Sequence, residues 1–151
     1  MEEFIMNLMP VVPWIGLGGL VFSIISYFLV LKQPVGNEKM RQISEKIHDG
    51  AMVFLKREYI IIAIFMVIVT IILGLVMPTI WTSVAYVCGA VSSMVAGFIG
   101  MKAATRANVR TCQAAKEGGT SLALAVAFRG GSVMGLAVAA LGVIGIGFFF
   151  Y

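Results

Sequence analysis

Apolar residues dominate three long stretches of the chain, and charged residues are confined to the segments between them. No Asp, Glu, Lys or Arg occurs in 4–31, 59–101 or 130–151. A helix needs about 20 apolar residues to cross the hydrocarbon core of a bilayer. The first and last stretches each suffice for one crossing, and the middle stretch suffices for two. The pattern therefore predicts an all-α integral membrane protein with four transmembrane helices.

Proline residues mark the ends of the predicted crossings. Pro10 and Pro13 suit the first turn of a helix, where a missing N–H costs nothing, and Pro34 follows Lys32 as a stop signal. Pro78 divides the middle stretch, because its ring removes a donor and restricts the residue before it. We therefore predict crossings over 11–31, 59–77, 79–100 and 129–151.

Two polar segments connect these crossings. In 39–56, apolar residues recur at helical spacing with charges between them, which predicts an amphipathic helix that runs along or into the membrane and serves packing and anchoring. In 101–128, the basic residues 102, 106 and 110 are spaced four apart and residues 121–128 are apolar, so we expect helices three and four to extend beyond the bilayer there, with helix four starting near Thr120 or Ser121. Gly118-Gly119 is then the loop between the two extensions.

The distribution of basic residues predicts the orientation. The chain has 11 Lys and Arg, and all of them lie in 32–58 and 101–129. By the positive-inside rule, loops 32–58 and 101–128 are cytoplasmic and both termini lie outside. The start Met-Glu-Glu lacks the basic region of a signal peptide, so we expect the first crossing to be retained in the cell membrane.

Composition changes this picture little. Apolar residues make up 60% of the chain, and the mean hydropathy is +1.01. The net charge of +4 suggests nucleic acid as a partner, but no soluble basic domain accompanies it. We therefore expect no nucleic-acid binding, and we expect the lipid bilayer to be a partner.

Small residues at helical spacing occur in the third and fourth crossings. Such stripes allow helix backbones to approach closely, although glycine is common in membrane helices anyway. The second crossing instead consists mostly of Ile, Val, Phe and Met, which suits contact with lipid. The predicted packing residues are Gly89, Ser93, Gly97, Gly100, Gly131 and Gly135.

Four basic residues form the main candidate for a functional surface. Lys102, Arg106 and Arg110 are spaced four apart and share one helix face, and Arg129 opens the fourth crossing. This stripe is suited to holding lipid headgroups, attracting an anionic substrate or pairing with carboxylates of another part of a larger protein. Orientation in the membrane and headgroup contact is the simplest of these roles.

Side chains that support hydrolysis or metal binding are scarce. Asp49 is the only Asp, His48 is the only His, and no carboxylate lies in a predicted crossing. Glu45, His48 and Asp49 resemble a ligand cluster, yet such groups are common on solvated helices. We therefore predict no catalytic residue, no metal ligand and no bound cofactor in this chain. The same scarcity argues against a small proton-coupled exporter.

The two cysteines are too far apart to pair. Cys88 and Cys112 would lie about 36 Å apart on a continuous helix. A disulfide requires a separation of less than about 7 Å between Cα atoms. We therefore expect two free thiols, which suit a reducing compartment.

Three segments of the chain resemble one family. The stretches 49–59 (DGAMVFLKREY), 100–111 (GMKAATRANVRT) and 127–135 (AFRGGSVMG) are similar to the N-terminal region of membrane-integral pyrophosphatases. The three segments occur in order over most of the chain. The topology predicted above also agrees with that family, whose N-terminus lies outside and whose catalytic face is cytoplasmic.

The resemblance implies a larger machine than this chain. Members have about sixteen helices, couple hydrolysis of magnesium pyrophosphate to proton or sodium transport, and work as homodimers. Their acidic site begins on the fifth helix with the signature DVGADLVGK, which is absent here. The resemblance therefore identifies the chain as the first four, outer helices of such a pump, with magnesium implied only for the full-length protein. The alternative is a standalone four-helix membrane scaffold or assembly protein without enzymatic activity.

Overall fold

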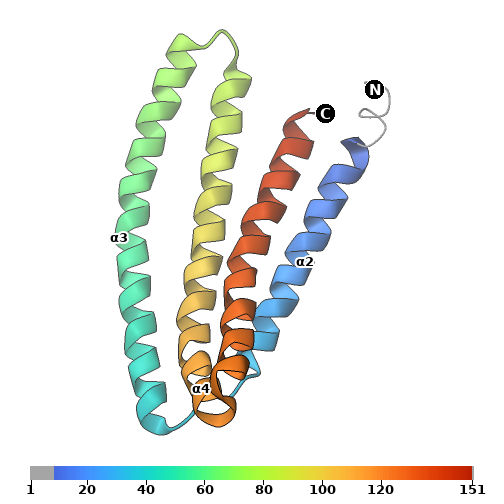
Figure 1. The fold of residues 1–151 in the computed structure, drawn as a ribbon. Coiled ribbons are helices and arrows are strands. Elements are labelled where there is room, and N and C mark those ends of the chain that lie inside the picture. The colour runs from blue at the N-terminus through green and yellow to red at the C-terminus, as the bar shows by residue number, and fades with distance from the viewer. Residues whose placement is uncertain (1–8, 151) are drawn as a thin grey trace.

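The computed structural model describes residues 9–150, and this part of the chain is all-α. Our expectations for residues 1–8 and 151, including the positions of the two termini, lie outside the described residues. Figure 1 shows the arrangement of the helices. The elements are a 3-10 turn η1 (Met9–Val11) and the helices α2 (Val12–Leu31), α3 (Glu38–Val76) and α4 (Ile80–Phe150).

Helix α2 begins one residue after the start of the predicted range 11–31 and ends at the same residue. Pro13 lies in its first turn, where no hydrogen-bond donor is lost. A short linker then leads to α3, and Gly36 in this linker has a φ of 92°, which side chains other than glycine rarely adopt. A Cβ at Gly36 would lie 2.5 Å from Oε1 of Gln113 on α4. The linker is therefore held closely against α4.

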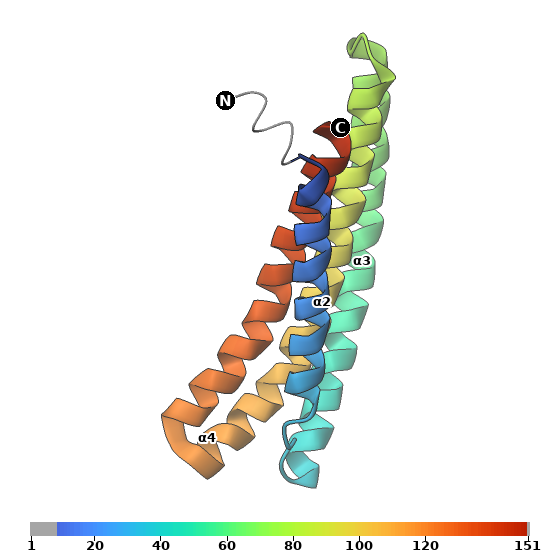
Figure 2. The same cartoon turned by 90° about the vertical axis from the view of Figure 1, so that its right-hand side faces the viewer.

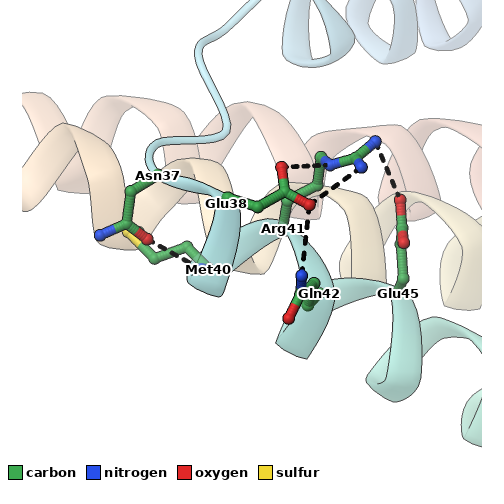
Figure 3. A network of polar contacts seen from close by, with 6 residues as sticks. All are labelled: Asn37, Glu38, Met40, Arg41, Gln42 and Glu45. Atoms are coloured by element: carbon green, nitrogen blue, oxygen red, sulfur yellow. Dashed lines mark hydrogen bonds and ion pairs between the residues drawn. The ribbon is translucent and has the colours of Figure 1, made fainter.

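Helix α3 begins with a polar network on its first two turns, which Figure 3 shows. The Met40 backbone N–H donates to Oδ1 of Asn37, the N-cap residue, over 2.9 Å. Arg41 pairs with Glu38 at 3.0 Å and with Glu45 at 3.6 Å. These exposed pairs support the start of the helix.

The rest of α3 is one continuous helix. The predicted amphipathic segment 39–56 and the predicted second crossing 59–77 therefore lie on a single element. The helix ends because Pro78 follows Met77, whose ψ of 140° is extended. None of the residues in the most apolar window of α3 is buried.

Helix α4 consists of two arms that run in opposite directions. Its only non-helical residue is Gly119, with a φ of 67° and a ψ of −161°. The chain reverses there, as the orange part of Figure 2 shows. We call residues 80–118 the first arm and residues 120–150 the second arm. Within the described residues, 80–100 of the predicted third crossing lie on the first arm and 129–150 of the predicted fourth crossing lie on the second arm.

Among the described residues, the three helices α2, α3 and α4 are long and apolar enough to cross a membrane. Large apolar side chains point outward along all of them, as Phe22, Phe65 and Ile146 do. Alanine is instead frequent at the buried positions, as at Ala103 and Ala137. Buried small residues and exposed large ones are typical of helices that pack in lipid.

Helix α2 packs mainly along the second arm of α4, so that segments far apart in sequence lie side by side (Figure 1). The Ser23 hydroxyl, which is 2% exposed, donates to the Val133 carbonyl over 2.7 Å. A Cβ at Gly16 would lie 2.6 Å from Cγ1 of Ile144, so these two helices touch closely there. Small residues thus permit the close approach.

Candidate functional site

The four basic residues of the predicted stripe have different surroundings. Lys102 and Arg129 are exposed, Arg106 is half-buried and Arg110 is buried. Lys102 places its Nζ 5.8 Å from the centre of the Phe98 ring, a cation–π contact within one helix. The shared helix face is therefore only partly open to solvent.

Arg110 is used to join two helices. Its Nε donates to the Gln33 carbonyl over 3.1 Å, and its Nη2 donates to the Leu31 carbonyl over 3.2 Å. Nη1 donates to the Arg106 carbonyl of its own helix over 2.7 Å. The last carbonyls of a helix have no partner within it and form its negative end, so a cation suits this position. Arg110 therefore caps the C-terminal end of α2 from α4.

The environment of Arg110 also affects its protonation. Burial, followed by the nearby charge of Arg106, lowers the pKa of the Arg110 guanidinium. An arginine nevertheless keeps its charge in a protein. The Arg110 guanidinium therefore donates to the three carbonyls as a cation. A charged donor forms stronger hydrogen bonds than a neutral one.

His48 connects α3 to the first arm of α4. Its Nδ1 lies 2.8 Å from Oγ1 of Thr105, and that hydroxyl donates to the Met101 carbonyl over 2.9 Å. Which of the two atoms donates in the bond between His48 and Thr105 depends on the tautomer of the imidazole. Burial, then the charge of Arg106 and a smaller effect of Lys102, lower the pKa of His48 against an opposing effect of Asp49.

The carboxylates around His48 do not converge on a metal position. Glu45 is paired with Arg41, while His48 is bonded to Thr105. Within residues 9–150, no three His, Cys, Asp or Glu side chains form a group suited to a metal ion. Magnesium takes oxygen ligands, mainly carboxylates and water. The described residues therefore do not fit a magnesium site, and we assign them no metal-dependent step.

The predicted packing residues fall into two sets. A Cβ at Gly100 would lie 2.5 Å from Sδ of Met134, and one at Gly97 would lie 3.2 Å from the Tyr59 hydroxyl. These two positions lie at contacts between helices. The positions Gly89, Gly131 and Gly135 have no atom within 4 Å of such a Cβ, and Ser93 is exposed.

An apolar groove runs between the two arms of α4. It has a volume of about 450 Å³, and Gly89, Ser93 and Ala96 line it from the first arm. The second arm contributes Gly142 and Gly145. The second arm also contributes the large apolar residues Leu141, Ile146 and Phe149, so small residues alternate with large ones along the groove.

Sequence reasoning did not identify several residues that hold the helices together. Ser23, Gly16 and Gly130 lie at contacts between helices, and Thr105 is the partner of His48. A serine in an apolar helix is one available signal, since its hydroxyl needs a partner in the membrane. The two cysteines are both free, as expected, and both are exposed.

Comparisons with known proteins identify the family. A family profile described as "Inorganic H+ pyrophosphatase" matches residues 17–151. A K(+)-insensitive pyrophosphate-energized proton pump 2 of Moorella thermoacetica is 40% identical over 146 residues, which cover 97% of this chain and 21% of that protein. A K(+)-stimulated pyrophosphate-energized sodium pump of Thermotoga maritima is 41% identical over 145 residues, with 95% and 19% covered.

A third relative leads to the same conclusion. A putative K(+)-stimulated pyrophosphate-energized sodium pump of Clostridium tetani is 45% identical over 122 residues, covering 80% of this chain and 18% of the relative. The chain thus spans about one fifth of the length of these relatives. With its apolar helices and the match over 17–151, it is an integral membrane protein that belongs to the inorganic H+ pyrophosphatase family of proton and sodium pumps.

Proposed function

We propose that the chain is the N-terminal, outer-helix portion of a pyrophosphate-energised proton or sodium pump and has no catalytic activity alone. The observation that supports this proposal is the family match, which covers nearly the whole chain. The same match covers only about one fifth of the length of the relatives. In this proposal the chain contributes membrane helices, while the remaining helices hold magnesium pyrophosphate and the ion path.

The scarcity of acidic residues supports an inactive portion. Phosphoryl transfer to water depends mainly on metal ions that position the reactants and neutralise charge. The chain has 7 Asp and Glu, of which Asp49 is the only Asp. Glu38 and Glu45 are already paired with Arg41. The residues present therefore do not suffice for a cage of several magnesium ions.

Four membrane crossings are part of the proposal. The first arm of α4, at 1.5 Å per residue, is about 58 Å long and the second about 46 Å, and both exceed a hydrocarbon core of about 30 Å. The reversal at Gly119 therefore allows each arm to cross once, in addition to α2 and α3. Segments 32–58 and 101–128 are then cytoplasmic and both termini lie outside.

The groove between the arms is the proposed contact surface for the missing helices or for a second copy of the full-length pump. Gly89, Ser93, Gly142 and Gly145 contribute small residues to its walls. A Cβ added at Gly131 or at Gly135 would likewise meet no atom of the described chain within 4 Å. These residues suit close contact with another helix, because no side chain keeps the backbones apart.

A complementation experiment tests the proposal. The 151-residue chain is co-expressed with a relative, such as the Thermotoga maritima pump, from which the matching fifth has been deleted. We expect magnesium-dependent pyrophosphate hydrolysis in membranes that contain both parts, and none with either part alone. A large side chain at Gly142 should reduce co-purification of the two parts, whereas Ile64→Leu on the exposed face of α3 should not.

Two outcomes would contradict the proposal. Phosphate release by the purified chain alone would show that it is catalytic. Failure of the two parts to associate, together with downstream DNA that encodes no acidic fifth-helix signature, would favour the standalone scaffold. A continuation of the gene that encodes this signature would support the pump.

A further inference from the structure

A second, smaller crevice lies between α2 and the first arm of α4. It has a volume of about 260 Å³, and its apolar walls are formed by Leu20, Ile24, Phe98 and Ile99. Ile24 is 51% exposed and Phe98 is 42% exposed, so the crevice is open to the side. In the proposed arrangement this side faces the lipid.

The one serine that lines the crevice, Ser23, already uses its hydroxyl in a hydrogen bond. Ser23 reaches the crevice, but its hydroxyl donates to the carbonyl of Val133 over 2.7 Å. That bond also fixes α2 against the second arm of α4. The crevice is therefore a preformed apolar channel, suited to a hydrocarbon chain and not to a polar molecule.

One end of the crevice is polar and positive. Tyr27 and Lys102 both line it at this end. Lys102 is the first charge after the uncharged stretch 59–101, and Tyr27 precedes Lys32 by little more than one turn. Both side chains therefore lie where the proposed crossings reach the cytoplasmic surface. Tyrosine and lysine are typical of this level, because their apolar parts stay in the membrane and their polar ends reach the headgroups.

Lys102 has no acidic partner in the described part of the chain. The ion pairs found there both belong to Arg41 on α3. The ammonium group of Lys102 instead lies over the Phe98 ring, at the edge of the crevice. A positive charge at the mouth of an apolar channel matches a molecule that joins an anionic group to a hydrocarbon chain.

We propose that this crevice binds one anionic phospholipid, with an acyl chain between Leu20, Ile24, Phe98 and Ile99 and the phosphate at Lys102 and Tyr27. The distance along α2 from Tyr27 to Leu20 is about 10 Å, enough for the upper part of an acyl chain. This inference rests on the proposed membrane crossings, but it does not depend on pyrophosphate hydrolysis.

Native mass spectrometry of the detergent-solubilised chain tests the site. Phosphatidylglycerol and phosphatidylcholine with the same acyl chains are added at equal concentrations. We expect one tightly bound phosphatidylglycerol per chain and weaker binding of phosphatidylcholine. Lys102→Gln should weaken phosphatidylglycerol binding about fivefold, the effect of roughly 1 kcal/mol per basic residue at an anionic surface. Lys116→Gln, an exposed position near the turn, is the matched control and should have no effect.

A second pair of variants tests the acyl-chain channel independently of charge. Ile24→Trp fills the crevice and should weaken phosphatidylglycerol binding, whereas Ile25→Trp, also exposed but not lining the crevice, should not. Glycerol 3-phosphate, which has the phosphate without the tails, should not bind. Equal binding of both lipids, equal effects of the two Lys variants, or equal effects of the two Trp variants would overturn the proposal. Circular dichroism of each variant verifies that the helices remain folded.

Discussion

Replacing Arg110 by alanine should detach the end of α2 from α4. The change removes one hydrogen bond to the Leu31 carbonyl at the end of α2, one to the Gln33 carbonyl in the linker that follows, and one bond within α4. A hydrogen bond with a charged partner contributes about 1.5–3 kcal/mol, and part of this gain is offset by the cost of burying the guanidinium. We therefore expect the free energy of unfolding to fall by about 3 kcal/mol.

Thermal unfolding in detergent, followed by circular dichroism, measures this effect. For a chain of this size 1 kcal/mol corresponds to about 2–4 °C, so Tm should fall by about 6–12 °C. Arg110→Lys keeps the charge but loses the forked geometry, and it should recover only part of the loss. Arg129→Ala, which removes an exposed cation, is the control and should change the free energy of unfolding by less than about 0.5 kcal/mol.

Hydrogen exchange distinguishes loss of the cap on α2 from a loss of stability throughout the protein. The backbone N–H groups of Lys32 and Gln33 bond to the Phe28 and Val30 carbonyls at the end of α2. In Arg110→Ala these two amides should exchange faster, while amides in the middle of α3 keep their rates. Equal Tm values for the Arg110→Ala and Arg129→Ala variants, with unchanged exchange at the end of α2, would refute the capping role.

Further predictions concern helix packing, pH and topology. Gly130→Ala places a methyl group 2.5 Å from the Ala107 side chain on the first arm and should lower the free energy of unfolding by about 1–3 kcal/mol. Gly131→Ala meets no atom within 4 Å and should leave the free energy of unfolding unchanged or raise it by up to about 1 kcal/mol in the same melting assay. Because the folded protein lowers the pKa of His48, stability should be complete above the unfolded pKa of about 6.5 and decline as the pH falls below it, and His48→Gln should reduce this decline. In sealed cells a membrane-impermeant thiol reagent should label a Thr79→Cys variant but not Cys112, and opening the cytoplasmic face should expose Cys112; the reverse pattern would invert the topology.

The positions of the helices follow from local features of the sequence. Pro78 predicts the break between α3 and α4 by restricting Met77, and Gly118-Gly119 predicts the reversal that the structure has at Gly119. These signals act on neighbouring residues, so one sequence suffices to interpret them. The amphipathic segment 39–56 looks like a separate helix only because its polarity changes near residue 58, and polarity does not interrupt backbone hydrogen bonding.

Contacts between helices depend on residues far apart in the chain, and local patterns did not predict them. The spacing of Lys102, Arg106 and Arg110 correctly describes a helix, but only the path of the linker after α2 brings two carbonyls to Arg110.

The glycines also show that local sequence patterns do not predict contacts between helices. Gly130 and Gly131 are adjacent and chemically identical, yet a methyl group at the first meets Ala107 while one at the second meets open space. A small residue permits close approach but does not determine which helix approaches. At Gly89 and Gly135 an added Cβ would meet no atom of the described chain within 4 Å. The partner of these two positions must therefore be sought in lipid or in another polypeptide segment, and co-purification with the remaining four fifths of a relative decides between the two.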